Sequence, residues 1–376
     1  MATNLTNDFG IEIRHLYKIF GYQAQASIER VKQGMSKAEL LSNHSHVLGL
    51  KDINISMPSG GIQVIMGLSG SGKSTLIRHI NRLIEPTAGE VIVGGVDVLK
   101  MSQNDLREFR RHKISMVFQK FALLPNRTVL DNAVYGLEIQ GMSRDRQVEI
   151  ATGWLDRVGL QGYANHYPNQ LSGGMQQRVG LARALASDAP ILLMDEAFSA
   201  LDPLIRMDMQ SVLLDLQKEI KKTIVFITHD LDEALRIGDR IAILRDGEVV
   251  QQGTRQEIVM NPADDYIANF VKEVNRGRVI GVEAIMQPIV QVKVAATLTV
   301  PVGTSLESAV KRLVEAGLDE LVVTDSQGQP VGQLALKSII ATMVTSTVSE
   351  ELQVVQPRVM SKATRLTEVN PGEIAG

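Results

Sequence analysis

Apolar residues up to about position 275 gather into short continuous runs, separated by stretches in which they recur at helical spacing. A continuous apolar run bounded by turn residues predicts a strand buried on both faces, as in a parallel sheet covered by helices. Strands of this kind are predicted at 62–66, 114–118, 191–194, 223–228 and 241–244. Because such strands alternate here with helical patterns, the chain is predicted to have an α/β fold.

A second set of strands and a helical region accompany these runs. Residues alternate in polarity at 11–16, a further strand is predicted at 47–55, and turn residues inside 90–97 indicate a hairpin. The segment from 119 to about 186 is predicted to be mostly helical. The pattern therefore predicts a mixed sheet core, an antiparallel β region and a helical region.

The stretch 21–50 differs from its surroundings, because it places helical patterns between two strands. One face of a predicted helix carries three apolar residues, Ile28, Val31 and Met35. Ser36 and Glu39 have the spacing of a capping box, which predicts a second short helix after them. We expect a helical insert at 21–50; the alternative interpretation is a surface decoration without a role.

Composition limits the classes of function. The chain has 376 residues, enough for two domains, and its formal net charge of −3 offers no basic field for nucleic acid. The absence of cysteine excludes disulfides and thiolate metal sites and is compatible with a cytosolic protein. No apolar run reaches the roughly 18 residues of a membrane span, and the first residues lack the pattern of a secretory signal.

One stretch indicates phosphate chemistry. It follows the predicted strand 62–66, precedes a helical pattern, and consists of Gly67, Leu68, Ser69, Gly70, Ser71, Gly72, Lys73, Ser74 and Thr75. This fits G-x-x-x-x-G-K-[ST], in which glycines let successive backbone N–H groups point at one phosphate group. Lys73 can reach the β- and γ-phosphates, and the Ser74 hydroxyl can bind Mg²⁺. The alternative is a glycine-rich turn before an ordinary helix.

Three further candidates follow predicted core strands. Asp195 and Glu196 come directly after 191–194, and His229 comes directly after 223–228. Ligands bind at the carboxyl ends of the strands in open α/β sheets, so we expect these residues near the phosphate loop. Asp195 can bind Mg²⁺, Glu196 can orient or deprotonate an attacking water, and His229 can contact the γ-phosphate. The alternatives are a surface acid pair and a structural histidine.

Composition changes after about residue 277. The residues up to 344 predict the order β-α-β-β-α, with the first helix passing through Ala309 and Leu313 and the last covering 337–344. This order occurs once, without a convincing second copy before Gly376. A unit with one such set of elements buries little surface alone, so we expect it to pair with the same unit of a second chain.

Taken together, the motifs at 11–275 resemble those of ATP-binding-cassette (ABC) ATPases. The matching residues are the phosphate loop, Gln119, the signature Leu171-Ser172-Gly173-Gly174, Asp195-Glu196, the loop Ser199-Ala200-Leu201-Asp202, and His229. The signature usually ends in Gln, where this chain has Met175. Within the family, the insert and the sequences of 195–206 and 228–234 resemble those of the ATPase subunit of glycine betaine/proline importers. The C-terminal unit resembles a cystathionine-β-synthase-type (CBS) regulatory repeat.

The resemblance implies a P-loop NTPase fold of ABC type over 11–276 and a small α+β CBS-like regulatory domain over 279–376. It implies ATP and Mg²⁺ as cofactors, with the metal at Ser74, Gln119 and Asp195. The implied catalytic residues are Glu196, His229 and Gln119. The implied ATP-binding residues are Phe20, Gly67, Ser69, Gly70, Ser71, Gly72, Lys73, Ser74, Thr75, Ser172, Gly173 and Gly174. Phe20 is preferred for stacking on adenine, and Tyr17 is the second choice.

The resemblance also implies partners. ATP would lie between two copies of the chain in a head-to-tail dimer, with the signature of one copy facing the phosphate loop of the other. The dimer would drive a separate integral membrane permease at the cytoplasmic face of the plasma (inner) membrane, supplied by a solute-binding protein. The implied function is ATP-powered uptake of a compatible solute for osmoprotection. The alternatives are an importer of another small solute, a soluble ABC ATPase acting on nucleic acid, and a regulatory ATP sensor.

Overall fold

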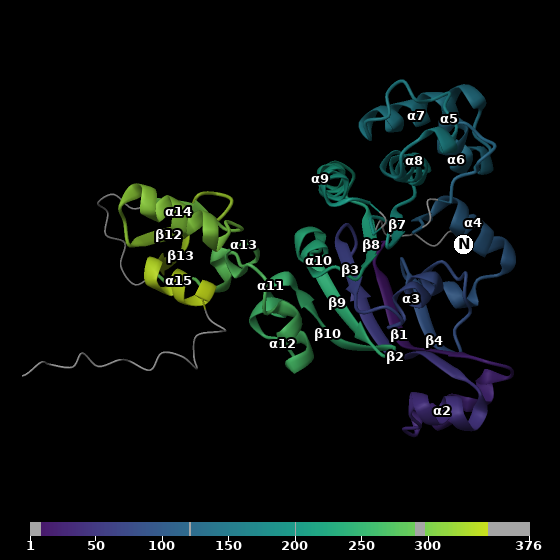
Figure 1. Cartoon of the computed structure of the whole chain (residues 1–376), viewed down its shortest axis with the longest axis horizontal. Helices are drawn as coiled ribbons and strands as arrows, with labels where there is room; N and C mark the ends of the chain where they lie inside the picture. Colours follow the sequence, from purple (N-terminus) through teal and green to yellow (C-terminus); the bar gives the residue numbers. More distant parts are fainter. Residues whose placement is uncertain (1–8, 120–121, 200, 290–297, 345–376) are drawn as a thin grey trace, which may run out of the picture.

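The computed structural model describes residues 9–119, 122–199, 201–289 and 298–344. Figure 1 shows two units, a large N-terminal one and a smaller C-terminal one that stands to its side. They are connected through three short helices, α11 (Arg255–Met260), α12 (Asp265–Val271) and α13 (Arg276–Val279).

The large unit is built on a six-stranded sheet with the order β10-β9-β3-β8-β7-β6. Its strands are β3 (Ile62–Met66), β6 (Ile114–Val117), β7 (Ile191–Asp195), β8 (Thr223–Thr228), β9 (Arg240–Arg245) and β10 (Glu248–Thr254). The first five run parallel, and β10 is antiparallel to β9. Every residue of β3, β7 and β8 is buried, which explains why these strands are mostly apolar. The predicted mixed sheet is confirmed.

A second, antiparallel sheet covers one side of this core. Its order is β2-β1-β4-β5, and its strands are β1 (Ile11–Phe20), β2 (Val47–Met57), β4 (Ala88–Val93) and β5 (Val96–Asp97). Helix α3 (Lys73–Ile80) directs its apolar face into the cluster between the two sheets, where Leu76, Ile77 and Ile80 are fully buried. The predicted hairpin at 90–97 corresponds to β4 and β5.

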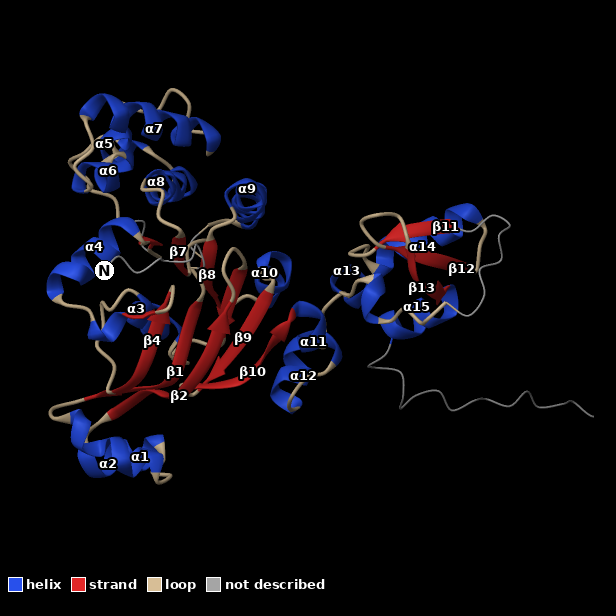
Figure 2. Cartoon of the chain, turned by 180° about the vertical axis from the view of Figure 1, so that it is seen from behind, coloured by secondary structure: helices blue, strands red, loops and turns tan. Residues whose placement is uncertain are grey.

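Helices cover the other face of the core sheet and form a separate group above it (Figure 2). The group contains α5 (Val129–Ala133), α6 (Tyr135–Ile139), α7 (Arg144–Arg157) and α8 (Gly173–Ala186). Three further helices are α4 (Gln103–His112), α9 (Pro203–Ile220) and α10 (Leu231–Ile237). Short 3-10 turns are η1 (Ala24–Ser27), η2 (Val98–Lys100), η3 (Pro168–Gln170) and η4 (Val282–Ala284). The predicted helical region is present, but its first helix begins only at Val129.

The insert is helical, as predicted, and has a small core of its own. It contains η1, α1 (Ile28–Lys32) and α2 (Lys37–His44), and the capping box joins Ser36 to Glu39. Ile28, Val31 and Leu40 pack with Tyr17 of β1, and Met35 lies at the edge of this cluster. The insert is therefore anchored on the antiparallel sheet.

The C-terminal unit has the predicted order β-α-β-β-α. Its elements are β11 (Leu298–Pro301), α14 (Leu306–Ala316), β12 (Glu320–Thr324), β13 (Pro330–Ala335) and α15 (Leu336–Val344). β11 is parallel to β12, and β13 is antiparallel to it. The last helix of the large unit is α12. It ends at Val271, and the separate helix α13 places Gly277 against Met343 of the small unit.

Helix α3 contains a buried histidine whose protonation depends on folding. His79 is fully buried, and its Nδ1 donates to the Thr75 carbonyl at 2.6 Å. Burial lowers the pKa of His79 to about 4, and the hydrogen bond to Thr75 offsets part of that effect. Because an unfolded histidine titrates near pH 6.5, the unfolded chain binds one more proton than the folded chain between pH 6.5 and about pH 4.

We therefore predict that the free energy of unfolding falls as the pH is lowered through this window, with His79 contributing about 3 kcal/mol of the loss. The His79→Gln variant keeps a donor for Thr75 but does not titrate, so its stability should depend less on pH. The measurement is denaturant unfolding of both proteins from pH 7 to pH 4. The exposed His112→Gln is the control, and equal pH dependence in all three proteins would contradict the assignment.

Candidate active site

Residues 67–72 form a tight loop that connects β3 to α3, as the sequence pattern predicted. Two of its glycines are required by the backbone. Gly67 has a φ of +150°, and a Cβ there would lie 2.1 Å from the Leu244 carbonyl oxygen. Gly72 has a φ of +101°, and its Cβ would lie 2.7 Å from the Gly49 carbonyl oxygen. The loop is thus packed between neighbouring strands, and no side chain fits at these positions.

The Lys73 ammonium lies over this loop. It is buried, and it donates to the carbonyl oxygens of Gly67 at 2.8 Å and Leu68 at 3.0 Å. The nearest carboxylate oxygen, Oε1 of Glu196, is 3.6 Å away. Within the described residues, the buried Ser71 hydroxyl has no hydrogen-bond partner. A buried cation and an unpaired hydroxyl in one glycine loop are the chemistry expected for holding phosphate oxygens.

Ser74 and Asp195 meet beside the loop. The Ser74 hydroxyl donates to Asp195 Oδ1 at 2.7 Å, and Arg78 Nη2 donates to Asp195 Oδ2 at 3.2 Å. Thr75, the next residue on α3, uses its carbonyl oxygen to accept from His79. The sequence predicted that Ser74 and Asp195 would share a site, but it gave no indication of Arg78.

Glu196 is the centre of a cluster of polar side chains. Its Oε2 accepts from Gln119 Nε2 at 3.0 Å, and His229 Nδ1 lies 3.6 Å from the same oxygen. The backbone of Glu196 is left-handed, with a φ of +45°, and its N–H donates to the Ile227 carbonyl at 3.2 Å. A non-glycine residue in this conformation is strained, and such strain concentrates at functional sites. Lys73, Gln119 and His229 are therefore gathered around the Glu196 carboxylate.

The two aromatic candidates of β1 differ in accessibility. The Phe20 side chain is 39% exposed, and its ring lies against Gly49, whose carbonyl oxygen in turn contacts the loop at Gly72. Lys18 Nζ lies 4.9 Å from the centre of the Phe20 ring. Tyr17 is buried in the core of the insert. Only Phe20 therefore combines an exposed ring with a place beside the loop.

Ser172, Gly173 and Gly174 form the start of α8. Ser172 caps the helix by accepting from the Met175 N–H at 3.3 Å, and both Ser172 and Gly173 are exposed. Gly174 is buried, and a Cβ there would lie 2.8 Å from Ile205 of α9. Within the described parts of the chain, no hydrogen bond or ion pair joins these residues to the glycine loop. The single chain thus brings together every other predicted polar group but keeps the signature separate.

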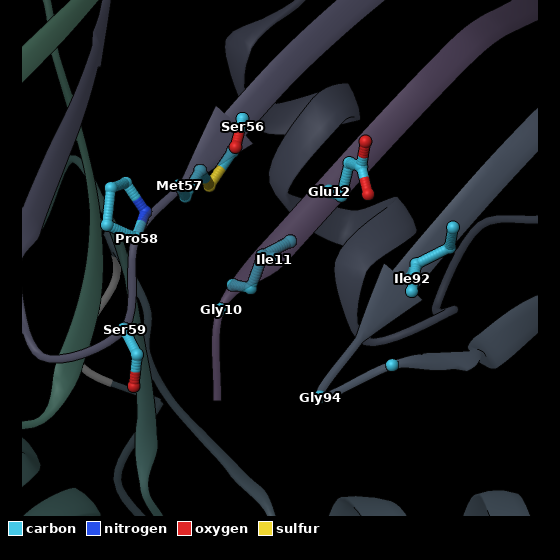
Figure 3. Close-up of a pocket in the computed structure, with 10 residues that line it drawn as sticks. Gly10, Ile11, Glu12, Ser56, Met57, Pro58, Ser59, Ile92 and Gly94 are labelled. Atoms are coloured by element: carbon cyan, nitrogen blue, oxygen red, sulfur yellow. The ribbon is translucent and has the colours of Figure 1, made fainter. Parts of the chain in front are cut away.

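A hollow away from the glycine loop is lined by residues of a different kind. It has a volume of about 840 Å³ and is lined by residues 10–12, 56–59, 92, 94 and 95, as Figure 3 shows. Among the described residues that line it, Glu12 is the single charged one, and the hydrogen bond from Arg14 lowers the pKa of that carboxyl. Because a carboxylate repels phosphate, this hollow is not a candidate for holding a nucleotide.

The sequence profile of the ABC transporter family matches residues 50–199. The chain is 49% identical over 342 residues to the glycine betaine transport ATP-binding protein OpuAA of Bacillus subtilis, spanning 89% of this chain and 82% of the relative. The chain belongs to the ABC transporter family. It is also 47% identical over 359 residues to the glycine betaine/proline betaine transport system ATP-binding protein ProV of Salmonella typhimurium, spanning 96% of this chain and 89% of that protein.

A solved ABC cassette has the same fold as the large unit. The dimeric post-hydrolysis state of the ATP-binding cassette MJ0796, bound to ADP and phosphate, is 35% identical and superposes with a TM-score of 0.56. It covers 65% of this chain and 98% of the cassette. This chain is therefore an ABC ATPase. Across the residues that the structure describes, no helix has the length and apolarity to cross a bilayer.

Proposed function

We propose that this chain hydrolyses ATP to drive the uptake of a compatible solute of the glycine betaine type through a separate permease. The observation that carries the solute class is the similarity to OpuAA and ProV along 342 and 359 residues, which extends into the C-terminal unit. Both relatives are named as ATP-binding proteins of glycine betaine transport. An importer of another small solute is the remaining alternative, because this subunit does not itself contact the solute.

We infer that the glycine loop holds the phosphates of ATP. The amides of Ser69, Gly70 and Gly72 would point at the β-phosphate, and Lys73 would exchange its two carbonyl partners for phosphate oxygens. Ser74 and Asp195 supply two oxygen ligands that suit Mg²⁺, which binds few protein groups and completes its shell with phosphate oxygens and water. When bound, Mg²⁺ would neutralise charge between the β- and γ-phosphates.

Glu196 would act as the general base. Its side chain is only 16% exposed, and its carboxylate lies beside two groups that can orient a water molecule, Gln119 and His229. Gln119 would also reach the metal, and His229 would contact the γ-phosphate. Phe20 would stack on adenine. Thr75, at the start of α3, would add its backbone N–H to the phosphate contacts.

The second half of the site would come from a second copy of the chain. Ser172, Gly173 and Gly174 lie at a helix N-terminus, which favours an anion. Two of these residues are exposed, and among the described residues none has a hydrogen bond or ion pair to the loop of its own chain. We therefore propose that they face the γ-phosphate bound by the partner. Hydrolysis would then require a head-to-tail dimer with two ATP molecules at the interface.

The permease would dock on a groove of about 380 Å³ beside α6. Three large apolar side chains in its lining are exposed, namely Leu83, Tyr135 and Ile139. The groove also contains Phe118, which precedes Gln119, so a partner segment there would be connected to the cluster around Glu196. We place this docking at the cytoplasmic face of the membrane, with a solute-binding protein delivering the solute on the opposite side.

The first test is uptake of labelled glycine betaine by vesicles that contain this chain and its co-purified permease. We expect ATP-dependent uptake that unlabelled glycine betaine or proline betaine competes away. Uptake of another small solute, with no effect of either betaine, would show that the solute class is wrong while leaving the importer role intact. ATP turnover without a co-purifying membrane partner would contradict the importer role.

Replacing Glu196 by Gln should remove the general base while keeping the shape of the side chain. We predict that ATP hydrolysis falls about 10²- to 10⁴-fold, the usual contribution of such a group, while ATP binding is retained. Steady-state hydrolysis and equilibrium nucleotide binding measure the two effects. The matched control is Glu149→Gln on the exposed surface of α7, which should hydrolyse normally. Normal turnover in the Glu196 variant would exclude its role as base.

The C-terminal unit is proposed to regulate the transporter rather than to contribute to the chemistry. Truncation after Asn275 removes it together with α13, which packs on it through Gly277. Charge contacts of this unit would weaken with salt, because the screening length falls from about 10 Å at 0.1 M to about 3 Å at 1 M. We predict that the truncated protein keeps ATP-driven uptake but responds less to ionic strength.

Vesicle uptake across a salt series compares the full-length and truncated chains. An unchanged salt threshold after truncation would reject the sensor role. Complete loss of ATP hydrolysis would instead show that the unit is part of the catalytic fold.

A further inference from the structure

Arg206 lies on the first turn of α9 and folds back over the loop that precedes this helix. Its Nη2 donates to the carbonyl oxygen of Leu201 at 3.3 Å and approaches that of Ser199 at 3.5 Å. Asp202 fixes the helix start, because its side chain accepts from the Ile205 N–H at 3.1 Å. The guanidinium thus holds the main chain of the loop that begins at Glu196.

The same guanidinium also reaches the turn after β8. Arg206 Nη1 donates to Asp230 Oδ2 at 3.1 Å, and Asp230 directly follows His229. The other carboxylate oxygen of Asp230 accepts from the Glu233 N–H at 3.0 Å, and the Asp230 N–H donates to the Thr228 hydroxyl at 3.0 Å. Asp230 is therefore held at three atoms, and its ion pair with Arg206 connects two rigid points.

A second contact joins α9 to α10 one helical turn later. Gln210 Nε2 donates to Glu233 Oε1 at 3.0 Å, and both side chains are buried. Arg206 and Gln210 lie four residues apart on α9, so they share one face of the helix. One face of α9 consequently contacts the loop after β7, the turn after β8 and the start of α10.

The two segments joined by Arg206 each carry one of the groups that meet at the proposed water site. Glu196 begins the loop, and the Ser199 N–H and hydroxyl both donate to its carbonyl oxygen, at 3.2 and 2.9 Å. His229 precedes Asp230, and its Nδ1 lies 3.6 Å from the Glu196 carboxylate. Arg206 does not touch that carboxylate, so its effect on it would pass through the two main-chain segments.

We propose that Arg206 is a positioning residue of the ATPase site, which sets the separation between Glu196 and His229 by joining the carbonyl groups of Ser199 and Leu201 to Asp230. This inference rests on the roles proposed above for Glu196 and His229. It predicts a loss that concerns turnover and not nucleotide affinity, because the glycine loop and Lys73 are held by other contacts.

The test uses the full-length protein. Arg206→Met keeps an unbranched apolar side chain but removes every donor and the charge. We expect kcat for ATP hydrolysis to fall about 10- to 100-fold, the scale of a 1 Å displacement at a reacting group. Equilibrium ATP binding should change by less than about threefold, because turnover and ground-state binding report different interactions. Arg206→Lys, which retains a charge for Asp230, should recover part of kcat.

Arg178 provides a matched control. It pairs with another residue of α9, Asp208, at 3.3 Å, donates to the Val158 carbonyl at 3.0 Å, and is similarly shielded, with 21% of its side chain exposed against 26% for Arg206. Arg178→Met removes an equivalent ion pair away from the loop and should leave kcat unchanged. An equal loss of kcat in both variants would attribute the effect to helix packing and overturn the proposal.

Asp230→Asn keeps an oxygen for the cap of α10 but removes the charge, so it tests the same link if Arg206→Met fails to fold. The double variant should be no slower than the slower single variant, because both changes break one interaction. Losses that multiply, or a weakened ATP affinity in either variant, would overturn the proposal.

Glu196→Gln is measured in parallel. If it is inactive while Arg206→Met is normal, this inference alone fails; if it is active, the proposed function fails first.

Discussion

The parallel pairing of β3, β7 and β8 is the constraint on which the rest of this structure depends. The register places Met66 opposite Thr228 and Asp195 opposite Ile227, so the three strands end at one level. Loops that leave these ends begin side by side, although more than a hundred residues separate the end of β3 from the end of β7 in the sequence. Main-chain hydrogen bonds between buried strands are expensive to break, which gives the glycine loop, Glu196 and His229 a rigid common base.

The sequence predicted that the glycine loop, Glu196 and His229 would lie close together, and the reason is physical. Strands covered on both faces must be apolar throughout, so they are easy to recognise, and polar residues directly after them stand at the same edge of the sheet. Which of the two aromatic side chains, Phe20 or Tyr17, is exposed is harder to predict. Irregularities in β1 interrupt its pairing with β2 between Ile13 and Lys18, so Leu16 and Tyr17 are both buried in succession. Simple alternation does not predict which side chains face outward after such a bulge.

Contacts made by long side chains could not be predicted in the same way. Arg78 and Arg206 carry no signal of their own in the sequence, because an arginine on a helix usually faces solvent. Their partners are set by the turns that precede or follow the helices, and those turns take shape only in the folded chain. The contact at the boundary between the two units, near Arg276, could not be predicted for a similar reason. A short stretch with two arginines and a glycine has the composition of a linker, but Gly277 allows close packing against Met343.

Ile205 and Gly174 touch where α8 and α9 cross, and this contact affects how the molecule can move. The glycine lets the two helices lie in close contact at the crossing, because a Cβ at Gly174 would come within 2.8 Å of the Ile205 side chain. A swing of the helical group would therefore pivot at this point. Because Ile205 lies in the first turn of α9, a tilt of α8 would also twist the segment between β7 and α9.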